Sequence, residues 1–245
     1  MDKTSKKKII LFIRRGYLEV EWILPILKEF NQEGYEIRTF FLSKQAYINL
    51  KVNGQVYKDW LKITTNYHIY NQSDNFFLRA SNFFTKYIFL SKFNKFFVQK
   101  LHSPNFVFLK LKIKSPEEVK FIITEHNNFS MWIKQFYLLK NRPKILFFPS
   151  STQVYLINSS HFQNKSKKLW GDNLFCISKF EIKLWKNFID KEKIIPIGVP
   201  LFNELSKKNN YKKTNKQKTI IFAYNCTLVS TLVNLAKSEL IKIFE

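Results

Sequence analysis

A carboxylate and an imidazole stand next to each other directly after an apolar segment of this sequence. Glu125 and His126 follow "VKFIIT" (119–124), a short run rich in β-branched residues that is typical of a buried strand. Either side chain at the end of such a strand can act as a general base. Because neighbouring side chains point in different directions, we expect only one of the two to face a substrate. The alternative is a surface pair or a hydrogen-bonded pair without a catalytic role.

A second polar cluster follows the first apolar segment of the chain. Arg14, Arg15, Gly16 and Tyr17 come directly after "KIILFI" (8–13) and before a helical pattern. A glycine at such a junction allows a ligand to approach the backbone closely, and the start of a helix favours an anion. These four residues are therefore candidate substrate-binding residues. The alternative is a tight turn with two solvated arginines.

Small polar side chains follow a third apolar segment, "ILFFP" (145–149). Ser150, Ser151 and Gln153 stand where a helix would begin, so they can bind hydroxyl or phosphate groups of a substrate. Ordinary capping of that helix is the alternative. Ser151 lacks the G-x-S-x-G pattern around a nucleophilic serine, so a nucleophile elbow is not expected.

No metal ion and no cofactor is expected from the sequence. The two cysteines, Cys176 and Cys226, lie in or just after apolar, strand-like runs. They have neither the spacing of metal ligands nor that of a disulfide framework. Each is therefore expected to be a small buried side chain.

The three apolar segments belong to an alternating series of strands and helices. Helical periodicity, with apolar residues three and four apart, is expected after most strands. The alternation predicts an α/β fold with a doubly wound, mostly parallel, Rossmann-like sheet. Ligands bind such sheets beyond the carboxyl ends of the strands, which is where the polar clusters stand. Strands are expected at 8–13, 35–42, 119–124, 143–151, 173–178 and 193–199, and helices around 23–30, 75–101, 130–140 and 180–188; the pattern at 42–75 is weak, with a helix and a short strand expected.

The composition indicates a globular protein with a strong positive charge. The chain has 245 residues, of which 45% are hydrophobic, and a formal net charge of +23. Such a charge attracts nucleic acid, phosphorylated small molecules or an acidic membrane surface. Codon drift in an A+T-rich coding sequence is an equally good explanation for much of it. With neither a signal sequence nor a long uninterrupted apolar segment, a cytoplasmic location is expected.

The charge is strictly one-sided between Asn75 and Pro116, which contain no Asp or Glu. Phenylalanines alternate there with lysines, as in helices that lie in a membrane interface. A core-facing helix with a solvated basic side is the main alternative, and a grip on single-stranded nucleic acid is the least favoured. The residues expected to contact an anionic membrane are Phe83, Phe84, Lys86, Lys92, Phe93 and Lys95.

The end of the chain has the pattern of a second domain. "IIPIGVPLFNEL" (194–205) is followed by a lysine-rich stretch without acidic residues (206–218) and then by "TIIFAYN", a strand-like run. We therefore expect a Rossmann-like domain over 1–205, a basic linker over 206–218, and the first strand and helix of a second domain over 219–245.

The segment "GDNLFCISKFEIKLWKNFIDKEKIIPIGVPLFNEL" (171–205) resembles the end of the N-terminal domain of GT-B type transferases of bacterial surface-carbohydrate synthesis. CDP-glycerol glycerophosphotransferases and the UDP-N-acetylglucosamine 2-epimerase group share this pattern. Asp172 to Ser178 match a "D-x-h-h-x-S" run, and Gly198, Pro200, Phe202 and Asn203 match "G-x-P-x-h-(D/N)". The resemblance extends over about 7–205. It implies an acceptor-side domain, with the loop of Arg14 to Tyr17 in the cleft.

The resemblance further implies transfer of a sugar or glycerophosphate from a nucleotide-linked donor to a polysaccharide or lipid-linked acceptor. Glu125 or His126 would deprotonate the acceptor hydroxyl. Two departures matter: Ser150 and Ser151 replace a His-Gly pair of the glycerophosphotransferases, and most of the donor-binding domain is missing. The chain is therefore expected to be inactive alone, and peripheral on the inner face of the cytoplasmic membrane if the basic segment contacts lipid. The alternative is a non-enzymatic module that binds anionic membrane or single-stranded nucleic acid through 75–116.

Overall fold

The structure, a computed structural model, describes residues 7–71, 102–126, 128, 130–149, 168–198 and 200. The chain divides into two compact units, Met1–Lys208 and Asn209–Glu245, and the described residues all lie in the first unit. The expected linker and second domain therefore lie outside the described residues. The same holds for the basic aromatic residues from Phe83 to Lys95 and for Ser150, Ser151 and Gln153.

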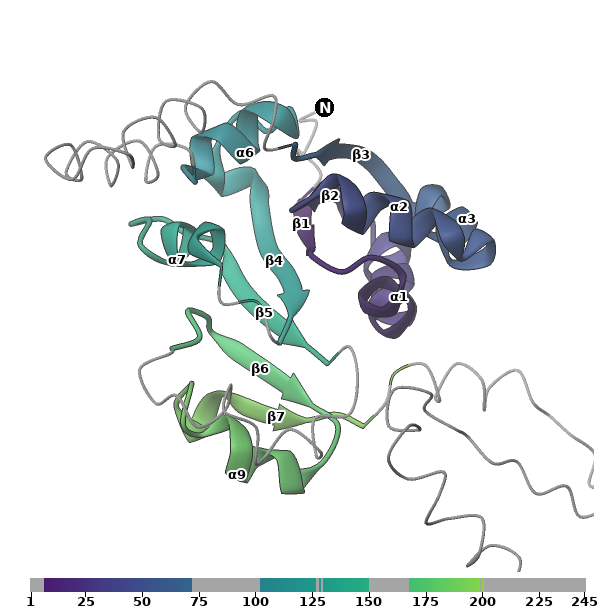
Figure 1. The fold of residues 1–245 in the computed structure, drawn as a ribbon. Helices are drawn as coiled ribbons and strands as arrows, with labels where there is room; N and C mark the ends of the chain where they lie inside the picture. The colour runs from purple at the N-terminus through teal and green to yellow at the C-terminus, as the bar shows by residue number, and fades with distance from the viewer. Residues whose placement is uncertain are drawn as a thin grey trace, which may run out of the picture. The chain divides into compact units, whose positions relative to one another are not determined.

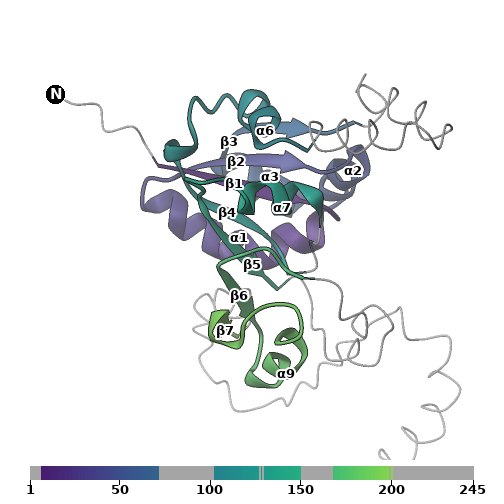
Figure 2. The same ribbon diagram turned by 90° about the vertical axis from the view of Figure 1, so that its left-hand side faces the viewer.

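Seven parallel strands form one sheet, which confirms the doubly wound α/β fold (Figure 1). The spatial order is β3-β2-β1-β4-β5-β6-β7, and the labels follow one another in this order in Figure 2. Every neighbouring pair is parallel. The strands are β1 (Lys8–Ile13), β2 (Glu36–Phe41), β3 (Thr64–Ile69), β4 (Val119–Glu125), β5 (Lys144–Phe148), β6 (Asn173–Cys176) and β7 (Ile194–Pro196).

Helices cover both faces of the sheet. Ile9, Leu11 and Ile13 of β1 pack in one core layer with α1 (Tyr17–Gln32), α2 (Lys44–Val52) and α3 (Gly54–Ile63). Ile10 and Phe12 point the other way, into a second layer. Its helices are α6 (Pro104–Lys110), α7 (Met131–Tyr137) and α9 (Ile182–Trp185). Because both faces are covered, β1 is buried throughout, and this explains its uninterrupted apolar sequence.

The segment with the weak pattern contains two helices and an edge strand. Ser43 accepts a hydrogen bond from the backbone N–H of Ala46 at the start of α2. Asn53 caps α3 in the same way, through the N–H of Val56. None of the residues of β3 is fully buried, as expected for a strand at the edge of the sheet.

Two expectations about helices need adjustment. The helix predicted around 180–188 is only a 3₁₀ turn (Lys179–Glu181) followed by the short α9. The helix expected around 23–30 is longer, because α1 begins at Tyr17 and ends at Gln32, with Pro25 inside it. Gly34, which follows the end of α1, has φ of 86°, a conformation that favours glycine at such an end. Two further 3₁₀ turns, Pro116–Glu118 and Lys191–Lys193, precede β4 and β7. None of the helices described is long and apolar enough to cross a membrane.

Candidate functional site

The strand order reverses between β1 and β4, which lie side by side in the middle of the sheet. From β1 the chain proceeds outward to β2 and β3, and it then returns to β4 and continues to the opposite edge. Such a switch point is where parallel sheets bind ligands, beyond the carboxyl ends of the strands. Arg14 and Arg15 directly follow β1, and Glu125 ends β4. The sequence predicted these polar groups separately, and the fold brings them together.

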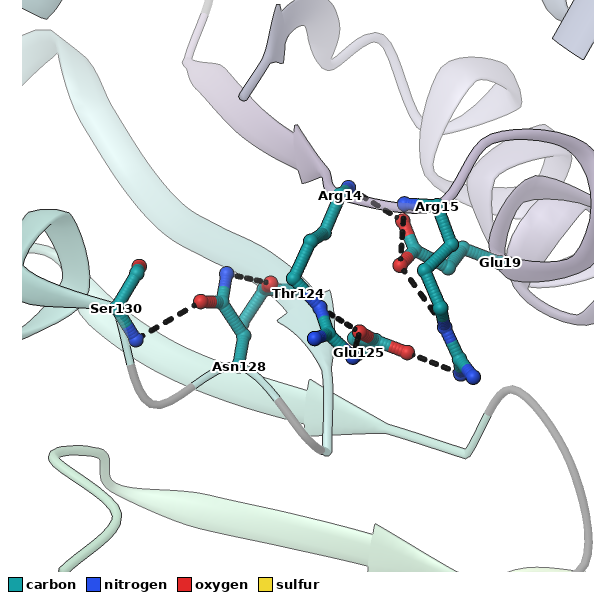
Figure 3. A network of polar contacts seen from close by, with 7 residues as sticks. All are labelled: Arg14, Arg15, Glu19, Thr124, Glu125, Asn128 and Ser130. Atoms are coloured by element: carbon teal, nitrogen blue, oxygen red, sulfur yellow. Dashed lines mark hydrogen bonds and ion pairs between the residues drawn. The ribbon is translucent and has the colours of Figure 1, made fainter. Parts of the chain in front are cut away.

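Glu125 binds both arginines (Figure 3). One oxygen, Oε1, lies 2.5 Å from Nε of Arg14. The other, Oε2, accepts a hydrogen bond from Nη2 of Arg15. The carboxylate is completely buried, whereas the side chains of Arg14 and Arg15 are 41% and 36% exposed. Both arginine side chains therefore extend from the buried carboxylate to the surface of the protein.

Glu19, which the sequence analysis did not single out, completes the site. Its carboxyl group is 1% exposed and accepts hydrogen bonds from the backbone N–H groups of Arg14, at 2.7 Å, and Arg15, at 2.9 Å. It also lies 3.5 Å from Nε of Arg15. Glu19 is in the first turn of α1, where a carboxylate that reaches back to preceding N–H groups is a known capping arrangement. We call Arg14, Arg15, Glu19 and Glu125 the arginine–carboxylate cluster.

The two carboxyl groups of the cluster titrate in opposite directions. Burial, the negative charge of Glu125 and a hydrogen bond to Glu125 raise the pKa of Glu19 well above its ordinary value. Burial also opposes the ionisation of Glu125, but the charges of Arg14 and Arg15 and the hydrogen bond with Glu19 outweigh it and lower its pKa. The cluster thus contains one carboxyl group that favours its proton and one that favours its charge.

Gly16 allows α2 to pack closely against the loop that follows β1. Its φ is 106°, and a Cβ atom there would lie 2.6 Å from the carbonyl oxygen of Ala46 and 2.7 Å from Cβ of Asn49. The amide of Asn49 donates a hydrogen bond to the carbonyl oxygen of Arg15, at 3.1 Å. Tyr17 packs against the core layer of α1. Gly16 and Tyr17 thus determine the shape of the loop, and Arg14 and Arg15 carry its charged groups.

His126 points away from the cluster. Its ring lies on that of Trp185 in α9, with centroids 4.8 Å apart, and its backbone N–H donates to the carbonyl oxygen of Phe148. The residue is 1% exposed, and Nε2 has no hydrogen-bond partner among the residues described. Burial lowers its pKa to about 3, and the positive charges of Arg15 and Arg14 add to this effect against that of Glu125. The imidazole is therefore neutral near pH 7, and a weak base.

Buried hydrogen bonds hold the backbone that follows β4. The amide of Asn128 donates to the hydroxyl of Thr124, at 2.7 Å, and its carbonyl accepts from the N–H of Ser130 (Figure 3). The N–H of Asn128 donates to the carbonyl oxygen of Glu125. Since Thr124 and Asn128 are buried, these bonds restrict the orientation of Glu125.

Residues in the segment that resembles transferases have structural roles where the structure describes them. Asp172 forms a two-pronged ion pair with Arg142, at 2.5 and 2.8 Å, and accepts a hydrogen bond from the N–H of Ile145. It directly precedes β6 and so lies at the amino ends of the strands, whereas the cluster lies at their carboxyl ends. Gly198 has φ of 76°, a conformation that favours glycine. Among the residues described, no group of three or more His, Cys, Asp or Glu could hold a metal ion.

No protein-family model matches the sequence, and no curated protein matches it. Two solved structures that match are a glycosyltransferase from Rickettsia africae ESF-5 and the glycotransferase of kitacinnamycin. The first is 15% identical, over 79% of this chain and 43% of that chain, with a TM-score of 0.40. The second is 6% identical, over 89% of this chain and 56% of that chain, with a TM-score of 0.42.

This chain therefore spans about half the length of each of these two structures, at 43% and 56%. A likeness at this level of identity and TM-score says nothing about the chemistry of the arginine–carboxylate cluster. The fold of this chain is defined by its own strand order.

Proposed function

We propose that this chain is the acceptor-side half of a GT-B type transferase, glycosyltransferase-like or glycerophosphotransferase-like, of surface-polysaccharide synthesis. The observation behind the proposal is the meeting of Arg14 and Arg15 with Glu125 at the switch point of a parallel sheet. The resemblance of 171–205 to the end of such a domain supports the same assignment. The reaction would move a sugar or glycerophosphate from a nucleotide-linked donor to a hydroxyl group of a polysaccharide or lipid-linked acceptor.

The two arginines would bind a phosphate group of one of these substrates. Guanidinium groups form paired hydrogen bonds with phosphate oxygens, and both side chains are more than one-third exposed. The buried carboxylates on their inner side keep the guanidinium planes in place, so an arriving anion meets donors that are already oriented.

Of the two predicted bases, we assign proton transfer to Glu125. His126 is neutral, buried against Trp185 and directed away from the arginines. Both oxygens of Glu125 are held by arginines, which weakens it as a base in the structure described. When a phosphate takes over one guanidinium, a Glu125 oxygen becomes available to a neighbouring hydroxyl group. Glu125→Gln should therefore lower turnover in an assay of transfer to which a complete donor-binding half is also supplied.

The anion site is tested by calorimetric titration with sulfate and with methyl phosphate, because most of the donor-binding domain that a nucleotide sugar needs is expected to be missing. Replacing Arg14 and Arg15 together by Gln should weaken binding by about ten-fold or more, because hydrogen bonds between charged groups contribute about 1.5–3 kcal/mol each. The double Lys variant keeps both charges and should show a smaller loss, since the paired geometry is gone.

Lys58→Gln is the matched control, because Lys58 is an exposed cation on α3, away from the carboxyl edge of β1. Its affinity for both probes should stay within about two-fold of the unmodified protein, as expected for a screened surface charge. If Lys58→Gln and the arginine variants lost affinity equally, the binding would reflect the general positive charge of the protein, and the proposal would be overturned.

A second candidate function is contact with an anionic membrane through 75–116. In the described part of this segment, Leu109 is 74% exposed on α6, and the ammonium group of Lys110 lies 5.6 Å from the centre of the Phe106 ring. An exposed leucine beside a lysine is the pairing that favours an anionic lipid interface.

Sedimentation with vesicles that contain anionic lipid tests this second function. Binding should be lost when Phe83, Phe84 and Phe93 are replaced by Ser, and weakened by Leu109→Ser. A parallel titration with single-stranded oligonucleotides at increasing salt separates the lipid from a nucleic acid. Absence of binding to both would leave a core-facing helix as the explanation of the segment.

A further inference from the structure

Helices α6 and α7, which are neighbours on one face of the sheet, direct apolar side chains outward (Figure 1). Leu109 on α6 is 74% exposed, and Leu138, which directly follows α7, is 61% exposed. Met131 begins α7 and is 38% exposed. Met131 and Leu138 are two helical turns apart, so they lie on the same side of α7, while Ile133 and Phe136 are buried in the core.

The same face has a one-sided charge. The segments 102–116 and 128–144, which contain α6, α7 and the loops after them, include neither Asp nor Glu. Four lysines in these segments are exposed, namely Lys110, Lys112, Lys114 and Lys140. Helices α1 and α3, on the opposite face, mix their lysines with acidic residues such as Glu29 and Asp59. The positive charge is therefore concentrated on the side of α6 and α7.

An indole ring lies between two lysines at the end of α7. The ammonium group of Lys134 lies 5.2 Å from the centre of the Trp170 ring, and that of Lys168 lies 5.7 Å from the same ring. Trp170 also packs on Tyr137, the last residue of α7, with ring centroids 5.6 Å apart. Trp and Tyr beside basic residues are typical of the level of the headgroups at a membrane surface.

The acidic groups that border this face are already paired with cations. Asp172 forms the two-pronged ion pair with Arg142, whose guanidinium lies 4.2 Å from the centre of the Tyr137 ring. Asp190 is paired with Lys193, at 2.7 Å. These pairs neutralise the two carboxylates, and they leave the lysines of α6 and α7 to determine the sign of the surface charge.

We propose that this face of the sheet lies on a membrane that contains anionic lipid. Its contact residues are Leu109, Met131, Lys134, Leu138, Lys168 and Trp170, which we call the α6–α7 surface. The leucines and the methionine enter the boundary between headgroups and acyl chains, and the lysines bind the lipid phosphates. The inference rests on the second candidate function and deepens it, because it adds α7 and the segment of Trp170 to 75–116 and states which face of the sheet meets the lipid.

A nucleic acid fits the α6–α7 surface less well than a membrane does. Single strands bind by stacking bases on free aromatic rings. The ring of Trp170 is already in contact with two ammonium groups and with Tyr137. The most exposed apolar side chains are aliphatic, Leu109 and Leu138, and such side chains gain free energy when they leave water for acyl chains.

The experiment is co-sedimentation of the full chain with phosphatidylcholine vesicles, with and without phosphatidylglycerol. Binding should require phosphatidylglycerol and should weaken as salt is added. Replacing Met131 and Leu138 together by Ser should weaken binding by about ten-fold or more, because two apolar contacts with the lipid are lost. Replacing Lys134 or Lys168 by Gln should weaken it by about five-fold for each lysine.

Two variants on the opposite face are matched controls. Val52 on α2 is 78% exposed, so Val52→Ser removes an apolar side chain of similar exposure to Leu109. Lys58→Gln removes an exposed cation from α3. Both should bind the vesicles within about two-fold of the unmodified protein, since neither residue would contact lipid.

Tryptophan fluorescence gives a second readout that reports which face contacts the lipid. Vesicles with bromine on their acyl chains quench tryptophans that lie close to the membrane. Trp170→Phe should remove most of this quenching. Trp22→Phe, at a half-buried position of α1 on the opposite face, should leave the quenching unchanged. Equal quenching in the unmodified protein and Trp170→Phe would overturn the inference.

The outcomes separate this inference from the function on which it rests. If the triple Ser variant of Phe83, Phe84 and Phe93 loses binding but the variants on α7 do not, the inference is wrong and the second candidate function stands. If the unmodified protein does not bind the vesicles, both fail. Equal losses in the control variants would show a general effect of charge or apolar surface, and would overturn the inference.

Two other occupants of the α6–α7 surface are distinguished with the same variants. Analytical ultracentrifugation detects a second copy of the chain, and a titration with single-stranded oligonucleotides detects a nucleic acid. If the variants on α7 abolish self-association or oligonucleotide binding while vesicle binding is unchanged, the surface serves that partner and the inference is overturned.

Discussion

His126 should make the protein sensitive to mild acid. The folded protein holds this imidazole neutral, with a pKa lowered to about 3 from the ordinary 6.5, first of all by burial. The unfolded chain takes up a proton below pH 6.5. Since the folded state cannot follow until about pH 3, the stability associated with the neutral ring is complete above pH 6.5 and is lost as the pH falls toward 3.

The size of the effect follows from this interval. Each pH unit between the two pKa values costs about 1.4 kcal/mol, so the full span from 6.5 to about 3 corresponds to about 5 kcal/mol at most. Between pH 6.5 and pH 5 the loss is about 2 kcal/mol. His126→Phe removes the titration and keeps a ring on Trp185, whose centroid lies 4.8 Å from that of His126. Relative to the unmodified protein, the variant should gain about 2 kcal/mol over this window.

The measurement is urea unfolding followed by tryptophan fluorescence at several pH values from 7.5 to 5. His68→Phe is a control, because His68 has a pKa lowered by burial and by the charge of Lys110 but is only partly buried, among other rings. Its effect on the pH profile should be in the same direction and smaller. Parallel profiles for the unmodified protein and His126→Phe would refute the reasoning, since His126 would then titrate in the folded state near its ordinary pKa.

Two further predictions concern packing. Gly16→Ala should lower the free energy of unfolding by about 3 kcal/mol, because the added methyl group would overlap α2 at a position with positive φ. Gly34→Ala should cost only about 1 kcal/mol, because Gly34 has φ of 86° but no atom lies within 4 Å of the added methyl group. Chemical denaturation measures both free energies, and equal costs would refute the clash with α2. Cys226→Ser leaves Cys176 as the one thiol, and its reaction with a disulfide reagent at pH 8 should be at least about a hundred-fold slower in the folded protein than in urea. The reason is that burial raises the pKa of the Cys176 thiol to about 11. Similar rates in the two conditions would show that the thiol is accessible in the folded protein.

The sequence predicts the central strands of this fold well, for a physical reason. Strands β1, β4 and β5 are covered by helices on both faces, so they require continuous apolar runs that no surface segment needs. Strand β3 lies at the edge and is built from the polar sequence "TTNYHI", whose pattern is that of an exposed loop. This strand forms because it pairs with β2, and the sequence of the segment alone does not show that partner.

The site divides in the same way. Arg14, Arg15 and Glu125 could be predicted because the ends of parallel strands converge at one edge of the sheet. Glu19 was missed because α1 has several carboxylates, and its role depends on a partner from β4. One local signal existed: a glutamate in the first turn of a helix often reaches back to preceding N–H groups. The close approach of α2 to Gly16 could not be predicted, because it depends on packing between elements that the local sequence does not contain.

The high net charge of the chain contributes less to the site than its size suggests. At physiological ionic strength, charges on the surface are screened within about 8 Å, so most of the formal charge of +23 acts too far away to hold an anion at the switch point. Inside the cluster, two guanidinium groups face two carboxyl groups, and these charges cancel when both carboxyl groups are ionised. Replacing surface lysines should accordingly change the salt dependence of anion binding, whereas replacing Arg14 and Arg15 should change the affinity itself.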